Sequence, residues 1–205
     1  TAHPYGISKL QGEAGVRHLQ DDDFSVIILR KGTVCGYSPR MRLDLVVNTM
    51  FKTAIESGRI TVNNPSIWRP ILAIGDAAAA YVRAVEAAPS VSGTFNIASE
   101  NTTLGALADQ VAATLKRNMG LEPELEILSI ADVRNYKVSF ERARVQLGFK
   151  PAHDIDKIVW DLVQNRERFE DLDNPAYDNI STFRALTTEA LGVAGVKAPL
   201  AGSFR

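Results

Sequence analysis

The chain has 205 residues, of which 45% are hydrophobic and 23% charged, and its formal net charge is −1. This composition is that of an ordinary globular protein with one core, or with a core and a small lobe. It excludes a basic surface of the kind that binds nucleic acid. No apolar run approaches the ~20 residues of a membrane span, and no signal peptide opens the sequence. We therefore expect a cytoplasmic protein, which the single cysteine, Cys35, also fits.

Tyr5 and Lys9 lie four residues apart, directly after Pro4. Proline is tolerated in the first turn of a helix, and side chains at i and i+4 share one helix face. A helix running to about Leu19 would therefore place a phenol beside an ammonium. The nearby positive charge would lower the tyrosine pKa from its ordinary value of about 10, and the phenol could then exchange a proton with an alcohol. The same spacing also occurs on surface helices that have no function.

Strands and helices are predicted to alternate along the rest of the chain. Residues 24–30 are apolar and rich in β-branched side chains, as in a strand buried on both faces of a parallel sheet. The glycine-containing segment 31–39 follows as an irregular loop at the carboxyl end of this strand, where ligands bind in open α/β sheets. Further strands are expected at 59–62, 93–98 and 124–128, the last as a half-buried strand whose side chains alternate between a buried and an exposed face. Helices are expected at 43–57, where Gly58 would end the helix, and at 77–88. A third helix is expected to begin after Thr102 or Thr103 as its cap, and a fourth to begin at Asp154.

Several segments together resemble one protein family. The run Pro4-Tyr5-Gly6-Ile7-Ser8-Lys9 resembles the active-site signature of the extended short-chain dehydrogenase/reductases, which are NAD-dependent nucleotide-sugar epimerases and dehydratases. Weaker matches follow in the family's order up to about residue 165: Leu29-Arg30 with Gly36, Arg69 with Asp76, Phe95-Asn96, and Leu147-Gly148-Phe149. The sequence departs from the family's pattern at Thr33, at Ser38-Pro39 and at Ala73, where asparagine, Gly-Pro and histidine are usual.

The resemblance implies an α/β fold, with part of a doubly wound, Rossmann-like parallel sheet and a smaller α/β substrate-binding lobe. Residues 1–40 would form the C-terminal part of the dinucleotide-binding domain. Residues 41–170 would form the substrate-binding lobe, interleaved with returning Rossmann elements, and residues 171–205 a C-terminal tail. The sequence begins at Thr1 and contains no Gly-x-Gly-x-x-Gly after a strand. We therefore expect the second half of a larger enzyme, either a fragment or a truncated form.

The resemblance also implies a mechanism. Tyr5 would be the acid/base on a sugar hydroxyl or ketone, and Lys9 would support it and bind the nicotinamide ribose. Hydride would pass between the sugar and NAD, with NADP as an alternative cofactor. Lys31 and Thr33 are predicted to bind the cofactor, because the family's segment at this place contacts its nicotinamide side.

Substrate-binding residues are predicted from the same resemblance. Arg69 matches the arginine that binds the diphosphate of a nucleotide-diphosphate sugar, and a guanidinium suits phosphate oxygens. Arg134 and Asp132 match positions that contact the diphosphate or the ribose. Asn48 could face the diphosphate or the base, although a capping or solvated role is equally compatible with the sequence. Asp76 is predicted to be structural, as the cap of the following helix.

No metal site is predicted, because the three histidines lack metal-ligand spacing. Two functions remain open. One is an epimerase or dehydratase of nucleotide-diphosphate sugars. The other is a non-catalytic relative that binds a nucleotide sugar or oligomerises. A homodimer is expected, formed through the Tyr5–Lys9 helix and the 43–57 region or through a missing N-terminal half. The sugar, its reacting carbon and the nucleotide are not determined by the sequence.

Overall fold

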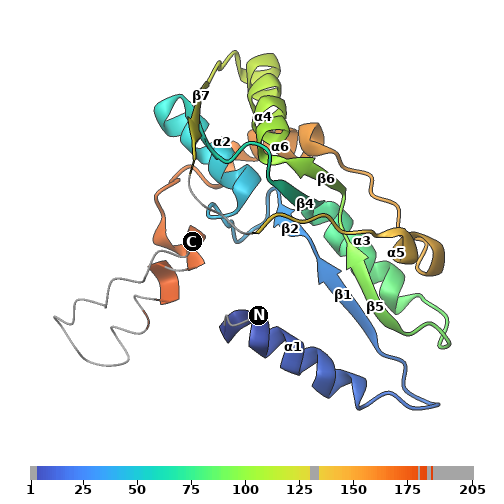
Figure 1. Ribbon diagram of the computed structural model, residues 1–205. Coiled ribbons are helices and arrows are strands. Elements are labelled where there is room, and N and C mark those ends of the chain that lie inside the picture. Colours follow the sequence, from blue (N-terminus) through green and yellow to red (C-terminus); the bar gives the residue numbers. More distant parts are fainter. Residues whose placement is uncertain (1–3, 130–133, 180, 184–185, 187–205) are drawn as a thin grey trace.

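The structure is a computed structural model that describes residues 4–129, 134–179, 181–183 and 186 (Figure 1). Its helices are α1 (Pro4–Arg17), α2 (Val46–Ser57), α3 (Ile74–Val85), α4 (Leu104–Met119), α5 (Glu141–Gln146) and α6 (Ile155–Gln164). Its strands are β1 (Ile27–Lys31), β2 (Thr33–Cys35), β3 (Arg59–Asn63), β4 (Trp68–Ala73), β5 (Gly93–Ile97), β6 (Glu100–Thr103) and β7 (Glu124–Leu128). None of the helices described is long and apolar enough to cross a membrane.

The strands form three small sheets, and parallel pairing dominates them. β1 pairs in parallel with β5, from Ile27 opposite Gly93 to Lys31 opposite Ile97. β4 pairs in parallel with β2 and antiparallel with β6, and β3 pairs in parallel with β7. Helices connect the parallel strands, as such pairing requires. The predicted α/β class with parallel strands is confirmed.

Local chemistry at the helix ends follows the sequence closely. Gly58 ends α2 in the left-handed conformation, with φ 67°, and its N–H bonds to the carbonyl of Ala54. Thr103 caps α4 by accepting a hydrogen bond from the backbone N–H of Ala106. Asp154 caps α6 in the same way through Lys157. These three predictions rested on side chains and backbone within one turn of each other, and all three are confirmed.

Two expectations about individual elements were wrong. Asp76 does not cap α3: the N-cap is Ala73, which forms no side-chain cap, and Asp76 lies inside the first turn, where it is buried. Residues 124–128 were expected to alternate between buried and exposed faces, but the side chains of the first four are exposed. Among the described residues β7 pairs with β3 alone, so it forms an edge without a covering layer.

The buried hydrophobic residues form two separate cores. The larger joins α2, α4 and α6 with β3, and includes the fully buried Phe51, Val111 and Val159. The smaller packs α3 and α5 against β5 and β1 around Phe95. Figure 1 shows α1 beside the β1–β5 pair, away from α2, α4 and α6. No residue of α1 is buried, so this helix belongs to neither core.

Candidate functional site

The first functional element is α1, which begins at Pro4 as its sequence predicts. Its first turns carry Tyr5 and Lys9 on one face. Lys9 Nζ lies 5.4 Å from the centroid of the Tyr5 ring. Tyr5 is 66% exposed, so its phenol is open to a ligand. The two side chains that the sequence singled out therefore share one environment.

That environment is a groove of about 980 Å³ between α1 and the β1–β2 segment. Tyr5, Lys9 and Glu13 line its α1 side, and residues 27–34 line the other side. Further walls come from Arg42, Tyr81 and Tyr136. Four predicted site residues thus meet in one groove although they come from three elements: Tyr5, Lys9, Lys31 and Thr33.

The turn from β1 to β2 fixes how Lys31 and Thr33 enter the groove. Gly32 separates them, and a Cβ at this position would lie 2.8 Å from the carbonyl oxygen of Pro70. Only glycine lets the two backbones approach this closely. Lys31 Nζ donates a hydrogen bond of 2.9 Å to the hydroxyl of Tyr81, so its ammonium is held at the groove wall. Sequence reasoning did not identify Tyr81.

The groove is positively charged. Lys9, Arg30, Lys31 and Arg42 line it, whereas Glu13 is the one acidic residue among the described lining residues. Arg42 donates two hydrogen bonds of 2.7 Å to Asp44. This carboxylate raises the pKa of Arg42, and the neighbouring phenol of Tyr5 contributes to the same effect. The excess of cations suits an anionic ligand such as a diphosphate.

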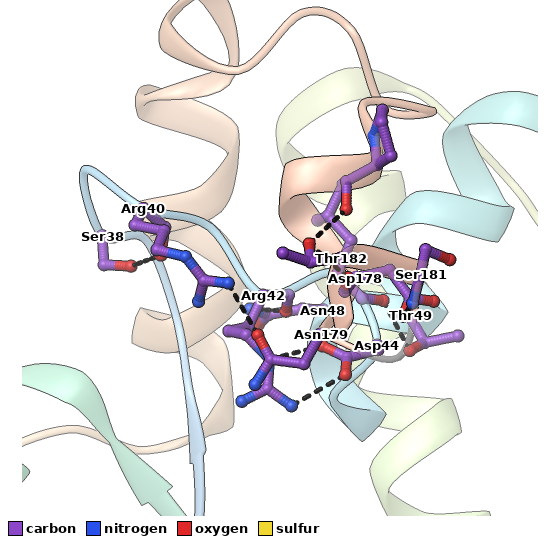
Figure 2. Close-up of polar contacts among 12 residues, drawn as sticks. Ser38, Arg40, Arg42, Asp44, Asn48, Thr49, Asp178, Asn179, Ser181 and Thr182 are labelled. Carbon is purple, nitrogen blue, oxygen red and sulfur yellow. Dashed lines mark hydrogen bonds and ion pairs between the residues drawn. The ribbon is translucent and has the colours of Figure 1, made fainter. Parts of the chain in front are cut away.

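A segment near the C-terminus supports the loop that carries Arg42. Figure 2 shows Asn179 between Arg40 and Asp44, and Arg40 Nη2 donates a 2.7 Å hydrogen bond to Asn179 Oδ1. The backbone N–H of Leu43 also donates to the carbonyl of Tyr177, at 2.9 Å. The sequence predicted only a C-terminal tail at 171–205, without these contacts. Its partners lie more than 130 positions away, so no local pattern could have identified them.

Asn48 has a different role from the predicted ligand contact. Its side chain is 1% exposed, and its Oδ1 accepts a 3.0 Å hydrogen bond from the N–H of Gly36. Its Nδ2 donates to the carbonyls of Gly36 and Arg42. The amide is therefore engaged by backbone on both sides. It joins the loop after β2 to α2 and does not line the groove.

The predicted phosphate-binding residues lie apart from Tyr5. Arg69 is 9% exposed, donates to the carbonyl of Trp68, and places its guanidinium carbon 6.0 Å from the centroid of the Tyr136 ring. Tyr136 lines the groove, whereas Arg69 does not. Arg134 is exposed on the extended segment that contains Tyr136. Asp132 lies outside the described residues.

This geometry can be compared with known proteins. Residues 1–98 match the NAD dependent epimerase/dehydratase family. The family resemblance is confirmed. The fold is also that of solved structures of this kind, although identities of 15–22% make this a likeness of fold alone.

Three solved structures illustrate the likeness. The dTDP-glucose 4,6-dehydratase of Bacillus anthracis, in complex with NAD, has a TM-score of 0.67 at 18% identity, with 85% of this chain and 55% of that chain covered. The UDP-glucose 4-epimerase of Thermotoga maritima, with UDP-glucose, has a TM-score of 0.66 at 20% identity, with 82% of this chain and 54% of that chain covered. The ADP-L-glycero-D-manno-heptose-6-epimerase of Helicobacter pylori has a TM-score of 0.65 at 20% identity, with 81% of this chain and 51% of that chain covered. The chain thus spans about half the length of the structures it matches.

Proposed function

We propose that this chain provides the catalytic and substrate-binding part of an NAD-dependent epimerase or dehydratase acting on a nucleotide-diphosphate sugar. The observation that carries the proposal is the basic groove in which Tyr5 and Lys9 face Lys31 and Thr33. The family match supports the reaction class. The matched structures that contain NAD or UDP-glucose support the cofactor and the substrate class.

The residues present fit the nicotinamide end of NAD. Lys9, Lys31 and Thr33 offer hydrogen-bond donors around an open space beside Tyr5. When bound there, NAD would accept a hydride from the sugar and return it. Lys9 and Lys31 would hold the ribose and the adjoining phosphate, and Thr33 would hydrogen-bond the nicotinamide side.

Tyr5 is proposed as the acid/base. Its phenolate oxygen takes the proton of a sugar hydroxyl as that carbon loses hydride, and the resulting neutral phenol gives the proton back when the ketone is reduced. The Lys9 ammonium, 5.4 Å from the ring centroid, stabilises the phenolate that takes this proton. Arg69 and Arg134 are proposed to hold the substrate's diphosphate. Arg69 does not line the groove, but its guanidinium carbon lies 6.0 Å from the ring centroid of Tyr136, which does.

The experiment is turnover of UDP-glucose and of dTDP-glucose in the presence of NAD, with products separated by chromatography and identified by mass spectrometry. Tyr5→Phe is expected to lower turnover by roughly 10²–10⁴-fold while nucleotide-sugar affinity is unchanged. Tyr177→Phe is the matched control, since Tyr177 packs against the larger core and not in the groove. Full activity of Tyr5→Phe would refute the assigned acid/base.

The second candidate is a non-catalytic relative that binds a nucleotide sugar or oligomerises. One observation favours it: α1 exposes Ile7 and Leu10, at 40% and 51%. Ile7, Leu10 and Ala14 form an apolar stripe at helical spacing, which a second copy of the chain could cover. Nucleotide-sugar binding without turnover would favour this function. Sedimentation of the wild type and of Leu10→Lys tests the homodimer.

A further inference from the structure

We propose that Glu13 is a positioning residue: through its ion pair with Arg30 it fixes where α1 holds Tyr5 and Lys9 over the groove. This inference rests on the proposed function, because it concerns the acid/base that the function requires. It goes beyond that function by naming the contact that aligns the helix with the sheet.

The first observation is how α1 is attached. A helix of this length is not stable alone in water and normally depends on a packed apolar face. Yet α1 has no buried residue. Hydrogen bonds connect its second half and the following turn to the β1–β5 pair. Glu13 contacts Arg30, Arg17 Nη2 donates to Thr94 Oγ1 at 2.6 Å, and Gln20 donates to Ser92.

The second observation is the geometry of the central contact. Arg30 Nε donates to Glu13 Oε1 at 2.8 Å, and Arg30 Nη2 donates to Glu13 Oε2 at 2.6 Å. Two parallel bonds of this kind fix orientation as well as distance. Arg30 directly precedes Lys31 on β1, so the contact joins the two walls of the groove.

The third observation is the position of Glu13 on its helix. Tyr5, Lys9 and Glu13 follow at intervals of four residues and line the same groove. At 1.5 Å per residue, Tyr5 lies about 12 Å along the helix from Glu13. A tilt of roughly 5° at Glu13 would therefore move Tyr5 by about 1 Å, and a misplacement of about 1 Å can cost on the order of 10²-fold in rate.

The charges of the pair agree with a supporting role. The hydrogen bonds from Arg30 lower the pKa of Glu13, and the carboxylate in turn raises the pKa of Arg30. Both groups are therefore ionised at neutral pH. An unpaired Glu13 would repel an anionic ligand in this groove, whereas the paired carboxylate is neutralised. Glu13 thus acts through the helix and does not bind the ligand.

The experiment is hydrogen exchange of the α1 peptide, followed by mass spectrometry on the 205-residue chain. Glu13→Gln and Arg30→Gln are expected to speed exchange across residues 4–12 by about two- to fivefold, the range for a half-exposed ion pair. The charge-exchanged double variant, E13R with R30E, is expected to restore protection. Glu86→Gln is the matched control, because the exposed Glu86, at the C-cap of α3, pairs with the exposed Arg83 at 3.7 Å. Unchanged α1 exchange in Glu13→Gln, or no recovery in the double variant, would overturn the proposal.

A kinetic measurement separates positioning from mere support of the fold. In the active protein, Glu13→Gln is expected to lower kcat by at least about tenfold with KM nearly unchanged, and the double variant to regain most of it. An equal loss through KM would overturn the positioning role. A wild type without turnover would refute the proposed function, whereas the exchange experiment would still decide whether Glu13 holds α1.

Discussion

His153 Nδ1 lies 2.7 Å from Oδ1 of Asp76, although the two residues are 77 positions apart in the sequence. Asp76 is 1% exposed and also accepts hydrogen bonds from Ser99 Oγ at 2.6 Å and from the N–H of Ala152 at 2.9 Å. One buried carboxylate therefore joins the start of α3, the turn between β5 and β6, and the approach to α6.

We expect Asp76→Asn to destabilise the protein by about 2–3 kcal/mol at neutral pH, because charge-assisted hydrogen bonds are lost and the new amide turns a donor toward N–H groups. Urea unfolding followed by circular dichroism measures this. The matched control is Asp109→Asn, on the exposed face of α4, which should change stability little.

The same residue predicts a dependence on acid. Burial alone would raise the pKa of Asp76, but the hydrogen bonds from Ser99, Ala152 and His153 outweigh it, so the folded-state pKa lies below its ordinary value. A carboxylate of this kind stabilises the fold above the unfolded-state pKa, near ~3.9, and that contribution is lost as pH falls through the folded-state value. Between neutral pH and about pH 3, wild type should therefore lose more stability than Asp76→Asn. Equal losses would contradict the assignment.

Gly75 provides the space in which the His153 ring lies. A Cβ at position 75 would be 2.9 Å from His153 Cε1, and the ring cannot swing away without leaving Asp76. We expect Gly75→Ala to cost about 1–3 kcal/mol, as overpacking does. In a His153→Ala background the same substitution should cost clearly less, because the clashing ring is absent. A double-mutant cycle from denaturant unfolding tests this, and additive effects would rule out the proposed contact.

The sequence predicted what depends on neighbours within a turn or on strand order. The ends at Gly58, Thr103 and Asp154 are of this kind, since each rests on one residue and its adjacent backbone. The meeting of Tyr5 and Lys9 with Lys31 could be anticipated, because helical spacing fixes the first pair and ligand sites follow the carboxyl ends of parallel strands.

The sequence could not predict contacts that only the tertiary fold creates. Asp76 is of a residue type that commonly caps helices, but its hydrogen-bond partners, Ser99 and His153, are distant in the sequence. Asn48 is polar, as a ligand-binding residue would be. Only the folded structure shows that the backbone of Gly36, in the loop after β2, forms hydrogen bonds with its amide. Arg69 matched a phosphate-binding pattern, but the pattern carried no information that this side chain would be 9% exposed and outside the groove lining.

The amide of Asn48 can be tested by an almost isosteric change. In Asn48→Asp the carboxylate can still accept from the N–H of Gly36, but it faces the carbonyls of Gly36 and Arg42 without a donor. We expect a loss of about 2–4 kcal/mol in unfolding free energy, because a buried charge would be left unpaired. Asn118→Asp is the control, since Asn118 is exposed and donates to the carbonyl of Thr114 one helix turn earlier. Comparable losses in both variants would refute the special role of Asn48.

Glu100 is a half-buried carboxylate of the opposite kind, one that lowers stability. Its Oε1 has no hydrogen-bond partner among the described residues, and burial, followed by the negative charge of Asp154, raises its pKa. A raised folded-state pKa means that the folded protein binds the proton more tightly. The destabilisation is therefore absent in acid, develops as pH rises above the unfolded-state pKa, near ~4.3, and is complete above the folded-state pKa.

We expect Glu100→Gln to raise the unfolding free energy by roughly 1 kcal/mol at neutral pH, because it removes the buried charge and its repulsion from Asp154. Near pH 4 the gain should shrink toward zero, since the wild-type carboxyl is then protonated. Chemical denaturation at the two pH values measures both effects, with the exposed Glu167→Gln as control. A gain that is the same at both pH values would arise from packing, and would contradict the electrostatic origin assigned to this residue.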